Sequence, residues 1–146
     1  MRNVKAILID PFTETISEVT HNAADYQNIY KLIDAPIFTA VYIEDDDAIF
    51  VDDEGLYRDN QRYFKWEGYH QPLAGKGLIL GADEEGETVA AKISLDEVQR
   101  RVSWLGELEV KEMLPVDGEI DHPVFGKMWQ VGNVPVFGRP EKKHDK

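Results

Sequence analysis

The sequence contains no cysteine and no long run of apolar residues. Without cysteine, disulfide scaffolds, thiol nucleophiles and cysteine-ligated metal centres are excluded, so stability must come from packing. The apolar run at residues 6–9 ends at Asp10 and is too short for the core of a secretion signal. No stretch approaches the roughly 20 apolar residues that span a bilayer. These absences predict a cytoplasmic protein that does not insert into a membrane.

Basic residues are scarce in the amino-terminal part of the chain. The whole sequence has 28 acidic and 16 basic side chains, which gives a formal net charge of −12. Residues 1–57 contain twelve of the acidic residues but only three of the basic ones. Proteins bind nucleic acids and anionic lipids largely through Lys and Arg, so the charge argues against direct binding to either. It predicts acidic loops that are solvated or that face a basic protein surface.

The order of the expected elements predicts one α+β domain over residues 1–114. Apolar runs bounded by turn residues indicate strands. The clearest prediction is a hairpin in which residues 78–80, flanked by Gly77 and Gly81, pair with residues 88–93. The expected strands cover residues 4–9, 15–20, 37–43, 48–51, 63–66, 78–80 and 88–93. Residues 37–43 are apolar on both faces, which favours a central strand. Mostly tight turns connect the strands, so we expect a mainly antiparallel sheet with two helices packed on it.

Two segments carry the signals of these helices. Asn22 stands at the expected N-cap of the first helix, which must end before Pro36. Ser94 and Glu97 form a capping box at the start of the second. The apolar stripes consist of Tyr26, Ile29, Tyr30 and Ile33 in the first helix and of Leu95, Val98, Val102 and Leu105 in the second. Spacings of three and four residues place each stripe on one helix face, which predicts packing against the sheet.

The carboxyl-terminal part differs in composition and contains four of the seven prolines. Residues 123–126 and 135–138 repeat the sequence Pro-Val-Phe-Gly, and Gly132-Asn133 between them suits a two-residue hairpin turn. We therefore expect a hairpin arm over residues 115–140, followed by a mobile tail at 141–146. The arm either folds onto its own domain or pairs with a second subunit. The side chains expected in such a homo-oligomer are Phe125, Trp129 and Phe137.

Three acidic turns, at residues 45–47, 52–54 and 83–87, are candidates for binding. None has the ligand spacing of an EF-hand, and the first two lie about 17 Å apart along one strand, too far to chelate one ion. Carboxylates at the two ends of a rigid strand suit a basic surface, such as a groove that normally holds the phosphates of a duplex. The alternative is that solvated acidic turns only keep the protein soluble. The residues predicted to meet a basic partner are Asp45, Asp46, Asp47, Asp52, Asp53 and Glu54.

Aromatic and basic residues are interleaved over residues 57–70, a pattern that would suit a nucleotide or a single nucleic-acid strand. In this alternative, a small ligand would be held by Arg58, Arg62, Tyr63 and Trp66. The ordinary alternative is a strand whose aromatic side chains enter the core while its basic side chains pair with nearby acids.

The sequence carries no catalytic motif. Gly75-Lys76-Gly77 lacks the Ser or Thr of a phosphate-binding loop, the four histidines show no metal spacing, and no serine has a Gly-x-Ser-x-Gly context. We therefore expect a binding protein, not an enzyme, and no cofactor. A metal-assisted hydrolase that uses the acidic turns is a weaker alternative.

Five short segments together resemble a known group of proteins. They are residues 5–11 (KAILIDP), 29–33 (IYKLI), 51–56 (VDDEGL), 73–81 (LAGKGLILG) and 83–87 (DEEGE). In these segments the chain resembles an uncharacterised family of small proteins carried by bacteriophages and mobile elements, over roughly its first two-thirds. That family has no assigned activity, so no site residue is transferred. The resemblance implies an accessory protein in a bacterial cytoplasm. With the charge, it predicts binding to a basic host partner, such as a component of a nucleic-acid-directed system that would be inhibited.

Overall fold

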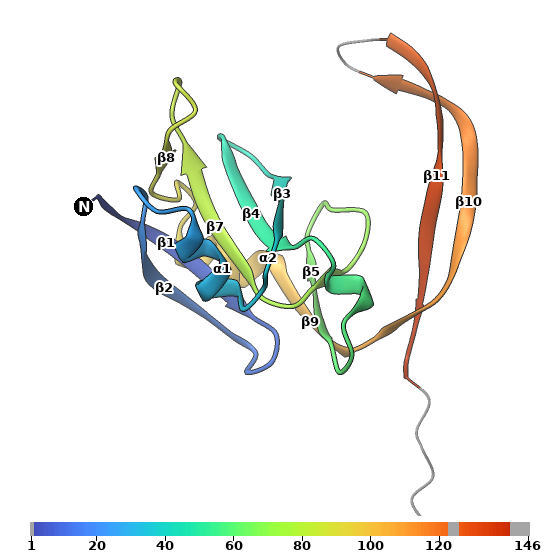
Figure 1. Cartoon of the computed structure of the whole chain (residues 1–146), viewed down its shortest axis with the longest axis horizontal. Coiled ribbons are helices and arrows are strands. Elements are labelled where there is room, and N and C mark those ends of the chain that lie inside the picture. Colours follow the sequence, from blue (N-terminus) through green and yellow to red (C-terminus); the bar gives the residue numbers. More distant parts are fainter. Residues whose placement is uncertain (1, 123–125, 141–146) are drawn as a thin grey trace, which may run out of the picture. The chain divides into compact units, whose positions relative to one another are not determined.

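An antiparallel sheet forms the centre of the amino-terminal unit of this protein (Figure 1). The computed structural model describes the backbone of residues 2–122 and 126–140, and the side chains of these residues outside 115–134. The chain divides into one unit at Met1–Glu107 and a second at Leu108–Lys146. The described part of the first unit is mainly antiparallel sheet with two α-helices. The predicted α+β class is therefore confirmed.

Among the described residues, the main sheet has six strands in the order β2-β1-β7-β4-β3, with β8 paired to the end of β7. The strands are β1 (Asn3–Asp10), β2 (Thr15–Asn22), β3 (Phe38–Tyr42), β4 (Asp47–Asp52), β7 (Gly77–Ala82) and β8 (Thr88–Val89). All of the pairings are antiparallel. In the central strand β7, a Cβ atom at Gly77 would lie only 2.9 Å from Ile49 Cγ2. Glycine at this position therefore lets β4 pack closely against β7.

Alternate residues of the main sheet face two different core clusters. Ile7, Ile79 and Ile49 are aligned across β1, β7 and β4, and all three belong to one cluster. Their neighbours Leu8 and Leu78 are also aligned, and they belong to the cluster on the opposite face. This alternation follows from the two-residue period of a strand. Because both faces are buried, the central strands are apolar at nearly every position.

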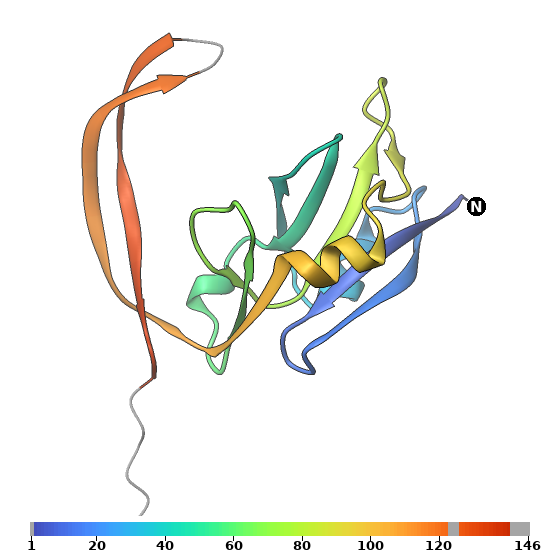
Figure 2. The same cartoon turned by 180° about the vertical axis from the view of Figure 1, so that it is seen from behind.

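Helix α1 covers one face of the main sheet, and helix α2 with a smaller sheet covers the other (Figures 1 and 2). Ile29 and Ile33 of α1 pack in the cluster of Leu78, whereas Phe64, Trp66 and Val98 pack in the cluster of Ile79. The elements of these layers are α1 (Gln27–Ile33), α2 (Leu95–Arg101), β5 (Arg62–Trp66), β6 (Leu73–Ala74) and β9 (Val102–Glu107). A short 3-10 helix, η1 (Gly55–Tyr57), connects β4 to the smaller sheet.

The start of α1 differs from the prediction. Asn22 is the last residue of β2, not an N-cap, and its Oδ1 atom accepts a hydrogen bond from the Ala24 N–H at 3.1 Å. Asp25 Oδ1 then accepts from the Gln27 N–H at 3.0 Å. Two successive side-chain turns of this kind compete with helix formation, which explains why α1 begins only at Gln27.

The capping box of α2 is confirmed, because Ser94 Oγ accepts a hydrogen bond from the Glu97 N–H at 3.2 Å. The helix ends at Arg101, so Val102 and Leu105 belong to β9 and not to the predicted helical stripe. From Val102 onward, the backbone pairs with strand β5 instead of continuing the helix. A tertiary contact with a strand some 40 residues earlier therefore overrides the local helical pattern.

The predicted central strand at residues 37–43 is instead the edge strand β3. Only Val41 within β3 is buried, whereas Tyr42 is 83% exposed and Ile37 beside the strand is 39% exposed. Apolar residues on both faces therefore did not predict the strand's position. The central strand of the main sheet is β7. Its glycines at both ends, Gly77 and Gly81, leave room for atoms of neighbouring elements.

The second unit contains a long hairpin of β10 (Glu109–His122) and β11 (Gly126–Gly138). The predicted hairpin is present, but its turn is not at Gly132-Asn133, since these residues pair with Val116 and Pro115 in mid-strand. A turn there would leave most of β10 without a partner. In the described residues, the pairing of the two strands continues as far as His122 and Gly126. Phe125, the side chain of Trp129 and the tail at 141–146 lie outside the described residues, so pairing of two subunits through Phe125, Trp129 and Phe137 stays a prediction.

Candidate functional site

Two of the three acidic turns lie side by side at one end of the main sheet. Because β4 pairs with β7, Asp47 lies opposite Gly81, and the Ala82 N–H donates to the Asp46 carbonyl oxygen at 3.0 Å. The β3–β4 and β7–β8 turns therefore project from the same end of the strands, at the top of Figure 1. We call their exposed carboxylates the acidic edge. It consists of Asp45, Asp46, Asp83, Glu84, Glu85 and Glu87.

The tip of the acidic edge is a two-residue turn formed by Asp45 and Asp46. The Asp47 N–H donates to the Glu44 carbonyl oxygen at 3.1 Å, and φ is 59° at Asp45 and 64° at Asp46. Positive φ at both central residues is the signature of a type I′ turn, in which Asn-Gly is the favoured sequence. Residues with a Cβ atom adopt this left-handed conformation at a cost that glycine does not have. Asn-Gly would form the same turn without charge and with less backbone strain. The chain nevertheless has two adjacent carboxylates at this position.

Few basic side chains accompany the acidic edge. Arg2 approaches Glu87 with an N–O distance of 3.7 Å, and both side chains are exposed. The ammonium group of Lys92 donates to the Ala82 carbonyl oxygen at 3.1 Å instead of joining a carboxylate. In the described part of the chain, no ion pair is formed by Asp45, Asp46, Glu84 or Glu85. The edge is therefore an exposed surface of largely uncompensated negative charge.

Asp47 is not part of this surface, contrary to the prediction. Its side chain is buried, with 1% of the residue exposed, and its carboxylate accepts hydrogen bonds from the N–H groups of Lys92 and Ile93 at 2.9 to 3.0 Å. These bonds hold the chain after β8, where the predicted strand at 88–93 is reduced to Thr88–Val89. Asp47 thus stabilises the fold by joining β4 to the segment that enters α2.

Asp52 is also occupied within the fold. Its two oxygens accept hydrogen bonds from the Arg58 guanidinium at 2.9 and 3.3 Å, and Oδ1 accepts a further bond from the Glu54 N–H at 2.9 Å. The hydrogen bonds to Asp52 raise the pKa of Arg58. Of the six predicted partner-binding acids, Asp53 and Glu54 are exposed but lie at the opposite end of β4 from Asp45 and Asp46.

The aromatic residues proposed for a small ligand lie in the core. Tyr63 and Trp66 belong to β5 and are 0% and 2% exposed, so in this structure neither ring is available to stack on a nucleotide. Arg62 pairs with Glu107 on the neighbouring strand β9 at 3.4 Å. Tyr63, Trp66 and the two arginines therefore follow the ordinary alternative, with rings packed inside and guanidinium groups paired with acids. The rest of the segment differs, because Lys65 donates to backbone carbonyl oxygens and Tyr57 is 72% exposed. Trp66 borders only a small hollow of about 90 Å³. Arg58, in contrast, lines a larger cavity.

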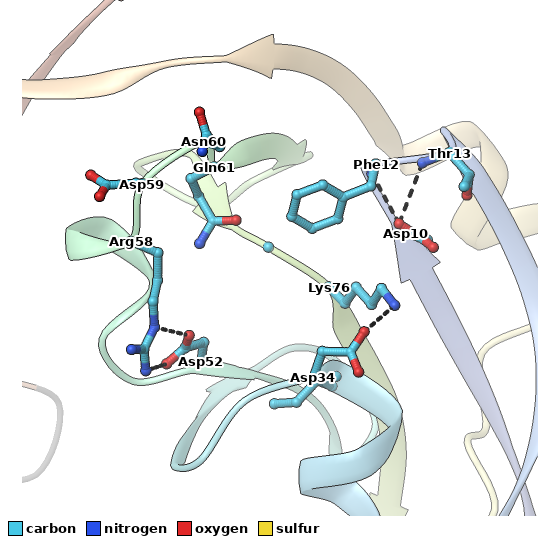
Figure 3. Close-up of a pocket in the computed structure, with 12 residues that line it drawn as sticks. Asp10, Phe12, Thr13, Asp34, Asp52, Arg58, Asp59, Asn60, Gln61 and Lys76 are labelled. Carbon is cyan, nitrogen blue, oxygen red and sulfur yellow. Dashed lines mark hydrogen bonds and ion pairs between the residues drawn. The ribbon is translucent and has the colours of Figure 1, made fainter.

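That cavity, which we call the end pocket, is a hollow of about 450 Å³ at the other end of the main sheet (Figure 3). Asp10 and Asp52 contribute to it from the ends of β1 and β4, and Lys76 immediately precedes β7 between them. The end of α1 supplies Asp34, and residues 58–61 close the opposite side. Sequence reasoning did not find this pocket, because its lining comes from five separate segments.

A cluster around Arg101 connects α2 to the β3–β4 turn. Its guanidinium forms a double hydrogen bond with the carboxylate of Glu44 and lies 4.6 Å from the ring centroid of Trp66. The side chain of Arg101 is only 12% exposed. Hydrogen bonds from Arg101, followed by its charge, hold the pKa of Glu44 below its ordinary value. The cluster fixes the base of the turn that carries Asp45 and Asp46.

This cluster predicts a pH-dependent contribution to stability. A carboxyl group with a depressed pKa stabilises the folded state above its unfolded pKa, about 4.3 for Glu, and this contribution is lost as pH falls through the lower folded pKa. Urea unfolding should show wild type to be more stable than Glu44→Gln at pH 7, with the difference shrinking toward pH 3. The matched control is Glu84→Gln, which removes an exposed carboxylate without an ion pair in the described structure. A difference for Glu44→Gln that does not change with pH would contradict this role for Glu44.

Within residues 2–122 and 126–140, the structure gives no group of three His, Asp or Glu side chains placed to hold a metal ion. Among the same residues, no helix has the length and apolarity to cross a membrane.

Comparison with other proteins places the chain in a family. Residues 3–103 match the family model described as "Domain of unknown function (DUF3846)". The chain is also similar to the "Uncharacterized protein y4iR" of Sinorhizobium fredii (strain NBRC 101917 / NGR234), with 28% identity over 98 residues. That alignment covers 66% of this chain and 60% of the relative, so the chain spans less than two thirds of the relative's length. No solved structure matches. The family match includes the whole main sheet and both α-helices, and the chain therefore belongs to the DUF3846 family.

Proposed function

We propose that this protein acts by binding a basic protein surface through its acidic edge. The observation that carries the proposal is the Asp45–Asp46 turn, where two carboxylates occupy left-handed backbone positions that favour Asn-Gly. Backbone strain at an exposed tip has no role in packing, and strained positions are frequent at binding sites. The neighbouring β7–β8 turn adds four more carboxylates to the same end of the sheet.

Electrostatics supports a positively charged partner. Concentrated charge of one sign steers an oppositely charged protein toward the surface and repels partners of the same charge. Arg2 contacts Glu87 of the edge, and Lys92 donates to a backbone carbonyl oxygen beside it. Within the described residues, most carboxylates of the edge therefore have no ion-pair partner. A basic surface is therefore the complementary partner, whereas nucleic acid would be repelled.

The biological setting is part of the same proposal. We place the protein among the accessory proteins of phages or mobile elements, working in a bacterial cytoplasm. The resemblance of residues 5–11, 51–56 and 73–81 to such proteins supports this setting, and so does the bacterial source of the similar protein. An acidic edge that occupies a nucleic-acid-binding groove would make the protein an inhibitor of a nucleic-acid-directed system.

The double variant Asp45→Asn/Asp46→Gly tests the role of the turn. It converts the tip to the favoured Asn-Gly sequence, so the free energy of unfolding should rise by about 1 kcal/mol while partner binding falls. Urea denaturation followed by tryptophan fluorescence measures the first effect. A variant less stable than wild type would show that the two aspartates are there for the fold and would remove the argument from strain.

Binding is tested by capture from a bacterial lysate on immobilised protein. The matched control is Asp53→Asn/Glu54→Gln, which removes the same charge at the opposite end of β4. We expect wild type and this control to retain the same basic protein at low salt, and Asp45→Asn/Asp46→Gly to lose it. Equal retention by all three proteins, or equal loss in both variants, would refute a specific role for the acidic edge.

A further inference from the structure

The end pocket has the features of a binding site for an organic cation. It combines a hollow of about 450 Å³, an exposed aromatic ring and an excess of carboxylates (Figure 3). Pockets of about 300 to 1,000 Å³ are typical of small-ligand sites. We propose that the end pocket binds a guanidinium group on an alkyl chain, as carried by an arginine side chain or by a free alkylguanidine. This proposal is independent of the acidic edge, which lies at the other end of the strands.

The basic groups of the pocket are already neutralised. Arg58 is held by both oxygens of Asp52, and the ammonium group of Lys76 is paired with Asp34 Oδ2. Neither cation is therefore free to receive an anionic ligand. A phosphate or carboxylate would have to displace an aspartate that already makes this contact, so the paired bases argue against an anion in the pocket.

Two carboxylates of the lining are not paired with a base. Asp10 Oδ1 accepts hydrogen bonds from the N–H groups of Phe12 and Thr13 at 2.9 and 3.4 Å, and among the described residues its Oδ2 takes part in no hydrogen bond or ion pair. Asp59 is exposed and forms no ion pair with any described residue. With four aspartates against one arginine and one lysine, the lining carries a formal charge of −2. This charge is complementary to a cation.

Phe12 indicates which shape of cation the pocket would accept. Its side chain is 46% exposed, although it is large and apolar, and Figure 3 shows its ring directed into the hollow between Asp10 and Gln61. The planar guanidinium group stacks on aromatic faces, and this contact is stronger where water is excluded. Carboxylates of the same pocket, such as that of Asp10, would accept the guanidinium N–H groups. An exposed Phe among carboxylates has no evident role in folding but suits this ligand.

The geometry favours a guanidinium group over a metal ion. The described residues include no group of three His, Asp or Glu side chains placed for metal coordination, and a phenyl ring supplies no oxygen ligand. Helix α1 ends at the pocket with Ile33 and Asp34, so the partial negative charge of its carboxyl-terminal carbonyls also faces this region.

NMR titration of the full chain tests the proposal with three probes. N-acetyl-arginine amide represents an arginine within a protein, agmatine represents a free alkylguanidine, and N-acetyl-citrulline amide is the uncharged analogue of the first. We expect the arginine derivative or agmatine to shift the amide signals of Asn60, Gln61 and Gly75 in a saturable manner, with a dissociation constant of about 1 mM. The tighter of the two identifies the source of the guanidinium. The citrulline derivative should cause no saturable shift.

Variants assign the effect to the pocket. Asp10→Asn/Asp59→Asn removes both unpaired charges, while the amide oxygen introduced by the first substitution can still accept the two N–H groups of the turn. This variant should weaken binding by about tenfold or more. Phe12→Leu should weaken binding by about threefold.

Glu14→Gln/Asp53→Asn is the charge-matched control outside the pocket and should bind like wild type. Equal shifts with citrulline, absence of saturation for both cations, or equal weakening by the control and the pocket variant would overturn the proposal. Loss of partner binding in Asp45→Asn/Asp46→Gly would leave these results unchanged, so the two proposals can fail separately.

Discussion

Replacing Asp47 by Ala is expected to lower the free energy of unfolding by about 3 kcal/mol. The carboxylate is buried and accepts hydrogen bonds from the N–H groups of Lys92 and Ile93. Removing it leaves two backbone donors without partners, and an unsatisfied buried donor costs about 1 to 3 kcal/mol. These bonds also fix the segment that leads into α2, so their loss affects packing on that face of the sheet.

Urea unfolding measured by circular dichroism gives this difference directly. Asp47→Asn keeps one accepting oxygen and should lose less stability than Asp47→Ala. Asp53→Ala is the control, because this aspartate is exposed at the other end of β4, and its free energy of unfolding should change by no more than about 0.5 kcal/mol. An Asp47→Ala variant as stable as wild type would show that the buried carboxylate does not hold the chain after β8.

The second large effect is expected for Trp66→Ala, which should cost about 4 kcal/mol of stability. Trp66 packs in the cluster of Ile79 and Val98, and its ring lies under the guanidinium of Arg101. Truncation would leave a cavity in the space between the two sheets and would remove the contact with Arg101. Trp66→Phe fills part of this volume and should lose clearly less stability than Trp66→Ala.

The same variant separates a core role from a ligand-binding role. If Trp66 served mainly to stack a nucleotide, Trp66→Ala would leave the urea midpoint nearly unchanged. In that case, added nucleotide would raise the melting temperature of wild type but not of the variant. We expect the opposite pattern, with a large loss of stability and no protection of wild type by nucleotides. Protection of the wild-type protein by a nucleotide would restore the ligand-binding alternative.

Local sequence signals predicted those elements whose contacts are also local. The hairpin of β1 and β2 follows from a mainly apolar run at residues 4–9 and a β-branched run at residues 15–20, on either side of a turn that begins at Asp10. The start of α2 follows from the Ser94 capping box, in which donor and acceptor are three residues apart. Strand β5 is predicted by the aromatic residues Tyr63, Phe64 and Trp66, although its partner β9 lies about 40 residues later in the chain. In the first two cases, the physical cause lies within the segment itself.

Features that depend on distant contacts could not be predicted in this way. Asp47 and its neighbours Asp45 and Asp46 are the same type of residue, but only Asp47 meets N–H groups 45 and 46 residues later in the chain. Strand β3 lies at the edge of the sheet because the central strand β7 pairs with β4 and not with β3. The end pocket likewise forms only when the ends of β1, β4 and α1 meet beside Lys76.

The charge pattern predicted that acidic turns are prominent, but not how their roles divide. Asp47 and Asp52 hold the fold, and Asp45 and Asp46 project from the tip of the acidic edge. The β7–β8 turn, which the prediction of the partner site left out, lies beside that tip because β7 pairs with β4. Strand pairing therefore joined two acidic turns whose sequences lie almost 40 residues apart.

The central claim, that the Asp45–Asp46 tip binds a basic protein, is tested most directly by the dissociation constant of the captured partner. Calorimetry at low and at physiological ionic strength should compare wild type, Asp45→Asn/Asp46→Gly and Asp53→Asn/Glu54→Gln. We predict that affinity for wild type and for the second variant is similar and falls with added salt, while the first variant binds about tenfold or more weakly at low salt. Equal affinity of the tip variant and wild type, or an affinity that salt does not change, would contradict the claim.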